Sequence, residues 1–161
     1  MTRGMRNNNP LNIRFSPKNH WRGLAGSDGS TRLTNHGAFC RFDTLENGFR
    51  AAFLVIHRYL AVHGLKTVKE IVSRWAPEID NDTEAYIYFV CKRMNGSTKL
   101  TNHGTMDKVL DFHSSDDMCA LVGAMAQIES GDYDKDIIRK AYDMVRQSSP
   151  TIAAACVTVR H

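Results

Sequence analysis

Hydrophobic residues recur every three or four positions through most of the chain after residue 43, which is the period of a helix that buries one face. Each stripe begins after a residue that can cap a helix and stops at a glycine, a proline or a polar turn. The pattern predicts helices from Thr44 to Gly64, Thr67 to Pro77, Asp82 to Gly96, Ser114 or Ser115 to about Gly131, and Asp134 to Arg146, with a short one around 105–112.

The first 43 residues follow another pattern, in which turn-rich segments separate short extended pieces. The candidate strands are 12–15 and 39–43. Together with the helices, they predict a mainly α fold of the α+β type with a small N-terminal β element, formed as one domain over residues 1–147. The tail, residues 148–161, has only weak patterning, so no role is predicted for it.

One helical stripe ends in a charged residue. Met118, Leu121, Val122 and Met125 occupy successive positions of the stripe, and the next position is Glu129. Burial and the negative end of a helix both favour the neutral form of a carboxyl group, so both raise its pKa. A carboxylic acid that keeps its proton near neutral pH suits general acid catalysis by a glycosidase. The alternative is a helix-end glutamate that reaches into solvent.

The segment AQIESG, which carries Glu129, resembles the catalytic signature of lysozyme-like peptidoglycan hydrolases, including lytic transglycosylases and glucosaminidases. RNNNPLNIRF and WRGLAG resemble one cleft wall of the glucosaminidase branch, and DTEAYIYFV resembles the transglycosylase segment whose tyrosine lines the cleft floor. Tyr86 matches that tyrosine. In those enzymes the glutamate helix precedes the Asn-rich segment, whereas here it follows. The resemblance therefore implies a circularly permuted lysozyme-like fold, which nearby domain termini would allow.

Residues 3–95 as a whole show a second resemblance. The segments RGMRNNNPLNIR, FDTLENGFRAA and IVSRWAPEIDNDTEAYI are similar to a family of small phage virion-associated proteins and their bacterial relatives. That family is mostly described as structural, so this resemblance implies less about chemistry.

The first resemblance implies that Glu129 is the catalytic acid and base, and it points to a set of glycan-binding residues: Asn8, Asn9, Asn12, Trp21, Glu46, Tyr86 and Ser130. Asparagine can donate and accept hydrogen bonds with sugar hydroxyl and N-acetyl groups, and an aromatic face such as that of Trp21 can stack on a sugar ring. Three alternatives remain open. The asparagines can form an Asx turn, Trp21 can cover the core, and Tyr86, like Trp75, can belong to the core.

A second carboxylate is expected in most glycoside hydrolases, and Glu46, Asp43 and Asp132 are the candidates. Glu46 lies in the first turn of a predicted helix, where the dipole lowers a carboxyl pKa, so it suits a base or a stabilising charge rather than an acid. Lytic transglycosylases work with one glutamate, because the C6 hydroxyl of the substrate attacks the anomeric carbon. Since no second carboxylate stands out, the sequence favours this reaction.

Composition narrows the choice of partner. The formal net charge of +4 and the pI of about 9.0 suit a polyanion such as nucleic acid or cell wall, and they equally serve solubility. Lysine and arginine are scattered without interleaved aromatics, which argues against nucleic acid, and no apolar run has the length of a membrane span.

No HExxH motif or zinc-spaced Cys/His cluster occurs, so we expect neither a metal nor a cofactor. A cysteine peptidase built on Cys119 is disfavoured by Asp116 and Asp117.

The sequence thus leads to the hypothesis of a muramidase that cleaves the MurNAc-GlcNAc bond of peptidoglycan glycan strands. The N-terminus, MTRGMRNNNP, lacks the apolar region of a signal peptide. We therefore expect synthesis in the cytoplasm and action in the periplasm or cell wall after delivery by a phage particle, a type VI or other contractile secretion machine, or a holin-type pore. A toxin of this kind implies a periplasmic immunity protein. The alternative is a non-catalytic virion or secretion-apparatus component that binds glycan or protein.

Overall fold

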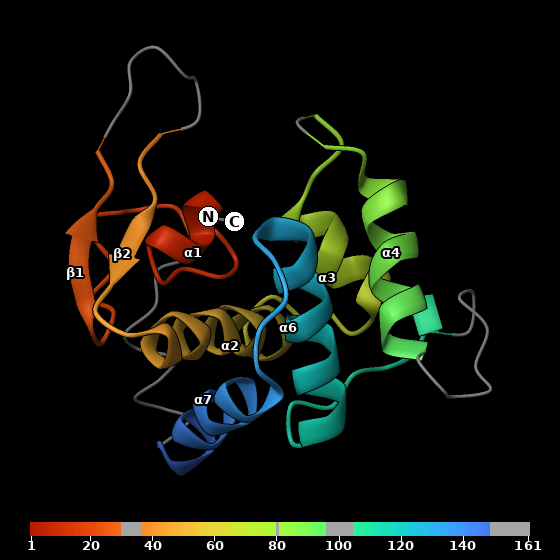
Figure 1. Cartoon of the computed structure of the whole chain (residues 1–161). Helices are drawn as coiled ribbons and strands as arrows, with labels where there is room; N and C mark the ends of the chain where they lie inside the picture. The colour runs from red at the N-terminus through yellow and green to blue at the C-terminus, as the bar shows by residue number, and fades with distance from the viewer. Residues whose placement is uncertain (30–36, 80, 96–104, 149–161) are drawn as a thin grey trace.

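Helix α2 (Leu45–Ala61) lies at the centre of the structure, a computed structural model that describes residues 1–29, 37–79, 81–95 and 105–148 (Figure 1). Every residue from Ala51 to Ile56 is buried, so this part of the helix is covered on all sides. Helices α6 (Ser115–Glu129) and α7 (Lys135–Gln147) pack against α2 and against each other. Helix α4 (Thr83–Asn95) packs on α6 and on α3 (Val68–Trp75). The mainly α fold class predicted from the sequence is confirmed.

The predicted helix starts are confirmed by their capping contacts. The side chains of four N-cap residues accept a hydrogen bond from a backbone N–H two or three positions later: Thr44, Thr67, Ser114 and Asp134. Ser114, rather than Ser115, is the cap of α6. Local side-chain chemistry therefore fixes where these helices begin, as the sequence indicates.

The β element differs from the prediction. It is an antiparallel pair of β1 (Leu24–Ser27) and β2 (Cys40–Phe42) with an irregularity between Leu24 and Gly26. Strand β1 lies in a segment where only turns are predicted. The strand predicted over 12–15 is wrong, since only an isolated bridge joins Arg14 to Phe39. The cause is local, because the side chain of Asn9 accepts from the backbone N–H of Ile13 and bends the chain before a strand can form.

The short helix predicted around 105–112 is also wrong over most of its length. Only Thr105 and Met106 are helical. Val109 instead forms an antiparallel bridge with Thr67, and the backbone N–H of Leu110 donates to the carbonyl of Lys66 at 2.8 Å. Pairing with the segment before α3 thus replaces the helix. Beyond residue 148, the tail lies outside the described residues.

Helix α1 (Arg3–Arg6) and the residues that follow it lie against the sheet, α2 and α6 (Figure 1). Gly48 of α2 permits the approach to α2, because a Cβ atom at this position would lie 1.8 Å from the carbonyl oxygen of Asn8. Asn8 has a φ of 50°, a left-handed conformation that asparagine adopts more readily than most residues. The N-terminal segment is thereby held between elements that lie far from it in the sequence.

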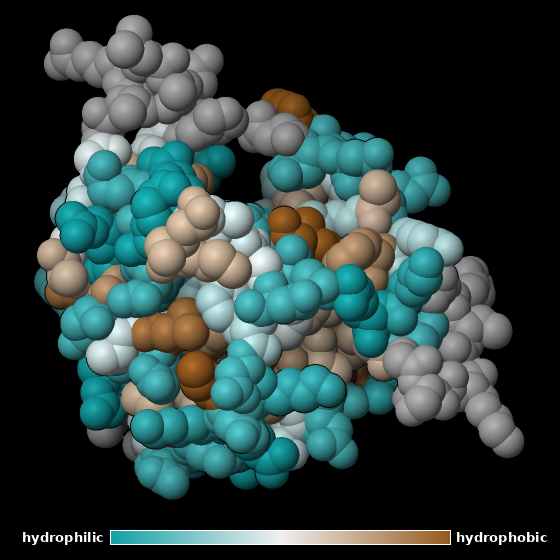
Figure 2. Space-filling model, viewed as in Figure 1, coloured by the Kyte–Doolittle hydropathy of each residue, from teal (hydrophilic) through white to brown (hydrophobic). Residues whose placement is uncertain are grey.

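Hydrophilic residues cover most of the face seen in Figure 2, and the hydrophobic patches on it are separate from one another. The outline is indented between the part that holds the sheet and the part that holds α3 and α4, and the C-terminal end of α6 lies at the base of this indentation (Figures 1 and 2). Within the described residues, none of the helices combines the length and apolar character that crossing a membrane requires.

Candidate functional site

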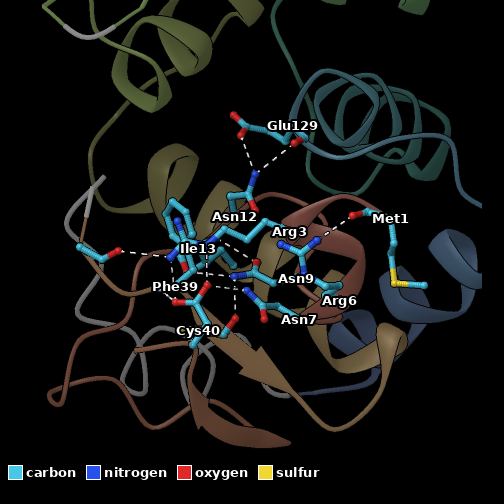
Figure 3. A network of polar contacts seen from close by, with 12 residues as sticks. Met1, Arg3, Arg6, Asn7, Asn9, Asn12, Ile13, Phe39, Cys40 and Glu129 are labelled. Atoms are coloured by element: carbon cyan, nitrogen blue, oxygen red, sulfur yellow. Dashed lines mark hydrogen bonds and ion pairs between the residues drawn. The ribbon is translucent and has the colours of Figure 1, made fainter. Parts of the chain in front are cut away.

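The N-terminal segment meets the end of α6 at Glu129 (Figure 3). The amide Nδ2 of Asn12 donates to the backbone carbonyl of Glu129 at 3.1 Å and to its carboxylate Oε2 at 3.3 Å. Asn12 has a φ of 52°, so the chain turns there in the left-handed region and the side chain faces α6. A contact across 117 positions of sequence thus orients the last residue of the helix.

The other carboxylate oxygen of Glu129 has two partners from the opposite side. The indole Nε1 of Trp75, the last residue of α3, donates to Oε1 at 3.2 Å. The hydroxyl of Tyr86, in the first turn of α4, donates to the same atom at 3.1 Å. Both aromatic side chains are buried, so their polar atoms need partners inside the protein, and Glu129 supplies one.

These three donors are all uncharged, and burial dominates the titration of the site. Burial raises the pKa of Glu129, while the hydrogen bonds from Asn12, Trp75 and Tyr86 lower it and offset part of that effect. The pKa of Tyr86 lies well above its usual value because of its own burial and the nearby carboxylate, so the hydroxyl remains a donor. The arrangement favours a carboxyl group that takes up a proton more readily than an exposed glutamate does.

Three of the predicted glycan-binding residues are buried in the fold. Asn9 is fully buried, and its Nδ2 donates to the carbonyls of Ile13 and Cys40 at 3.0 Å each. Ser130 is buried, and its Oγ donates to the carbonyl of Pro10 at 2.8 Å. Trp21 is 6% exposed and belongs to the hydrophobic core, so its ring covers the core rather than presenting a face for stacking.

Asn8 and Glu46 make no hydrogen bond to the carboxylate of Glu129. The side chain of Asn8 donates to the carbonyl of Phe42 at 3.2 Å, which joins the N-terminal segment to β2. Glu46 is half-buried in the first turn of α2 and is not among the groups that contact Glu129. Of the predicted binding residues, the structure therefore brings only Asn12 and Tyr86 to the carboxylate.

The candidate second carboxylates do not join the site either. Asp43 accepts a hydrogen bond from the side chain of Asn47 at 2.9 Å, and Asp132 is exposed beyond the end of α6. Among the described residues, no group of three or more His, Cys, Asp or Glu side chains could hold a metal ion.

The described cysteines are free thiols: Cys40, Cys91 and Cys119. Burial raises the pKa of Cys119 to about 11, which opposes thiolate formation. The cysteine peptidase alternative therefore loses the activated nucleophile that it requires. Cys156 lies outside the described residues.

Trp75 is the site residue that the sequence did not reveal. Its position on an apolar stripe indicates a core residue, and its ring is indeed buried. The available signal is chemical, because a buried indole N–H usually has a hydrogen-bond partner. Finding that partner from the sequence would require knowing that the end of α3 lies beside the end of α6.

This chain is 35% identical over 143 residues to Protein P5 of Pseudoalteromonas phage PM2, and the match covers 88% of this chain and 80% of the phage protein. The chain belongs to the family of phage protein P5. The resemblance to a family of small phage proteins is thus confirmed at the level of a phage-related protein. No family model matches the chain.

Proposed function

We propose that this P5-family protein cleaves peptidoglycan glycan strands as a lytic transglycosylase, with Glu129 as general acid and then general base. The observation that carries the proposal is the setting of Glu129: a raised pKa at a helix C-terminus and three uncharged donors that hold the carboxyl group. This setting keeps a proton available for a leaving group and fixes the direction in which it is given.

The proposed reaction consumes no water. Glu129 gives its proton to the glycosidic oxygen, and the bond from that oxygen to C1 of MurNAc breaks, which leaves positive charge on the sugar. The C6 hydroxyl of the same MurNAc attacks C1, and its proton passes to the Glu129 carboxylate. The products are a 1,6-anhydro-MurNAc end and a GlcNAc end with a free hydroxyl, and the acid is regenerated.

The electrostatics of Glu129 favour one catalytic carboxylate over two. Its pKa is shifted by burial and by three uncharged hydrogen-bond donors, with no contribution from a second carboxylate among the described residues. A hydrolase of the usual kind uses a second carboxyl group within about 10 Å to activate water or to attack the sugar. The contact between the Asn-rich segment and the glutamate helix supports the permuted lysozyme-like arrangement that the sequence implies.

The direct test is digestion of purified peptidoglycan by the wild-type protein and by Glu129→Gln, with the products read by mass spectrometry. Gln retains the shape of the side chain and cannot give the proton. We expect anhydro-muropeptides from the wild type and none from a folded variant, as judged by circular dichroism. Equal product release by both proteins would remove Glu129 from the mechanism, and reducing ends in place of anhydro ends would indicate hydrolysis.

A second candidate function is a non-catalytic phage component that binds glycan or protein. It is favoured by the burial of Asn9, Trp21 and Ser130, which leaves fewer side chains near Glu129 for a sugar chain. A wild-type protein that is folded, sediments with peptidoglycan and releases no products would establish this function. Kinship with a phage protein also favours delivery by a phage particle over a secretion machine.

A further inference from the structure

We propose that Oε2 of Glu129 is the atom that carries and delivers the proton. We also propose that Trp75 is a positioning residue, whose indole occupies Oε1 and so keeps the proton on Oε2. The inference rests on the proposed function for its catalytic meaning. The location of the proton is a property of the free protein, so it can be tested without substrate.

The argument starts from the number of acceptor positions on a carboxylate. Each oxygen offers about two lone-pair directions. Oε1 receives two donors, the indole of Trp75 at 3.2 Å and the hydroxyl of Tyr86 at 3.1 Å. Oε2 receives one donor, the amide of Asn12, at 3.3 Å. A proton can therefore bind Oε2 with all three hydrogen bonds intact. A proton on Oε1 must either displace Trp75 or turn the Tyr86 hydroxyl from donor to acceptor, which would leave its buried O–H without an acceptor among the described residues.

Neither donor on Oε1 can move away at low cost. Trp75 is 5% exposed and Tyr86 is 7% exposed, and the rings of Trp75 and Tyr59 pack edge to face with centroids 6.4 Å apart. Displacing the indole or the phenol group would break its hydrogen bond to Glu129 inside the protein, which costs free energy. The two rings thus make Oε1 the carbonyl-like oxygen of the protonated acid and hold the O–H on the side of the N-terminal segment.

The chain provides an internal control for the test, because it has two tryptophans. The indole nitrogen of Trp21 is buried and has no acceptor among the described residues. The experiment follows both indole N–H signals by NMR while Glu129 titrates, and Trp21→Phe identifies the Trp75 signal. We expect the Trp75 indole to remain protected from exchange in both protonation states, with the larger change at the Asn12 side-chain amide.

A proton on Oε1 would give another result. If that proton reversed the hydrogen bond of Tyr86, Tyr86→Phe would lower rather than raise the pKa of Glu129, which would overturn the inference. If it displaced Trp75, the exchange rate of the Trp75 indole, relative to Trp21, would rise about tenfold as Glu129 becomes protonated, the equivalent of losing one hydrogen bond. That rise would overturn the inference. It would leave the proposed transglycosylase reaction standing, because digestion by wild type and Glu129→Gln tests that separately.

A pair of variants tests the role of Trp75. Trp75→Phe and Tyr86→Phe each remove one donor and keep an aromatic ring, and each should raise the pKa of Glu129 by roughly 0.5 to 1, read from the side-chain carboxyl ¹³C signal. The chain has five glutamates, so Glu129→Gln identifies that signal. Trp21→Phe is the matched control and should leave the pKa unchanged. No change in Trp75→Phe, or an equal change in Trp21→Phe, would reject the positioning role.

Discussion

Residues 1–43 and residues 44–148 attain their structure by different means. In the first region, asparagine side chains bond to backbone groups, and Asn8 and Asn12 both adopt left-handed conformations. In the second region, hydrophobic stripes bury helices around α2, and capping side chains mark where the helices begin. The first region depends on the identity of individual residues, whereas the second depends on their pattern.

The candidate site lies where these two regions meet. Asn12 comes from the first region, and Trp75, Tyr86 and Glu129 come from the second. The site therefore depends on both regions: it needs a specific side chain from the first region and a packed helix end from the second. Substitutions that separate the two regions should therefore cost more than substitutions within the helical pattern.

The largest effect is expected from Gly48→Ala, at the contact between the two regions. The new Cβ would lie 1.8 Å from the carbonyl oxygen of Asn8, which is backbone and cannot turn away. We expect a loss of about 4 kcal/mol or more in unfolding free energy, measured by urea denaturation. Gly123→Ala in α6 is the matched control, because its nearest atom lies 3.6 Å away, and helix propensity predicts a gain of about 1 kcal/mol. Equal effects in the two variants would contradict the close approach.

Asn9→Ala tests the role of a single amide within the first region. The change removes three hydrogen bonds and leaves the buried N–H of Ile13 without its acceptor, although the carbonyl of Ile13 still accepts from the N–H of Cys40, so we expect a loss of about 3 kcal/mol. Asn81→Ala removes an exposed amide that donates to Pro77 and should cost less than about 1 kcal/mol. Thermal unfolding of both variants gives the comparison. A small loss in Asn9→Ala would mean that the turn forms without its side chain.

Asp28 gives the first region a pH dependence. Its hydrogen bond with Arg3 lowers its pKa from 3.8 to about 2, with further help from Phe39 and Asn7. A lowered folded pKa stabilises the protein above the unfolded pKa, and that stabilisation is lost as pH falls from about 4 towards 2. Asp28→Asn should therefore cost about 2 kcal/mol at pH 7, with the difference from wild type vanishing near pH 2. A difference independent of pH would show that the charge of Asp28 is not the cause.

The smallest effect concerns Glu129 and has the opposite sign. A raised folded pKa means that ionisation of Glu129 destabilises the fold, so this penalty appears as pH rises above 4.5. The unfolding free energy of Glu129→Gln relative to wild type should thus increase with pH over that range. Denaturation of both proteins from pH 4 to pH 8 measures it. A relative stability that falls with pH would mean that the hydrogen bonds outweigh burial.

The helical region was largely predictable because its signals are local. Thr44, Thr67, Ser114 and Asp134 each mark a helix start through a bond to a nearby N–H, and periodicity placed Glu129 at the end of a buried stripe. The β element was predictable only in part: β2 lies within the strand predicted over 39–43, whereas β1 lies in a segment whose turn residues gave no strand signal. Long-range contacts decide the rest of the fold.

The candidate site was predictable only in part, for the same reason. Glu129 and Tyr86 followed from resemblance, and both lie in the site. Asn9 and Ser130 belong to the same motifs, yet their side chains bond to backbone groups, which a motif does not distinguish from ligand binding. The role of Trp75 in the site was not predicted, because a stripe of apolar residues indicates that a side chain is buried but not which group its indole N–H contacts.

The contact between Asn12 and Glu129 also has a temporal consequence. During synthesis the amide of Asn12 emerges early, whereas the glutamate that it orients emerges only after most of the chain. A nascent protein, or a fragment cut between the two residues, lacks the assembled carboxyl site even where its other elements have folded. If Glu129 cleaves glycan as proposed, each new copy of the protein can complete its site only after translation has passed α6, so the order of the chain itself delays the appearance of activity in that copy.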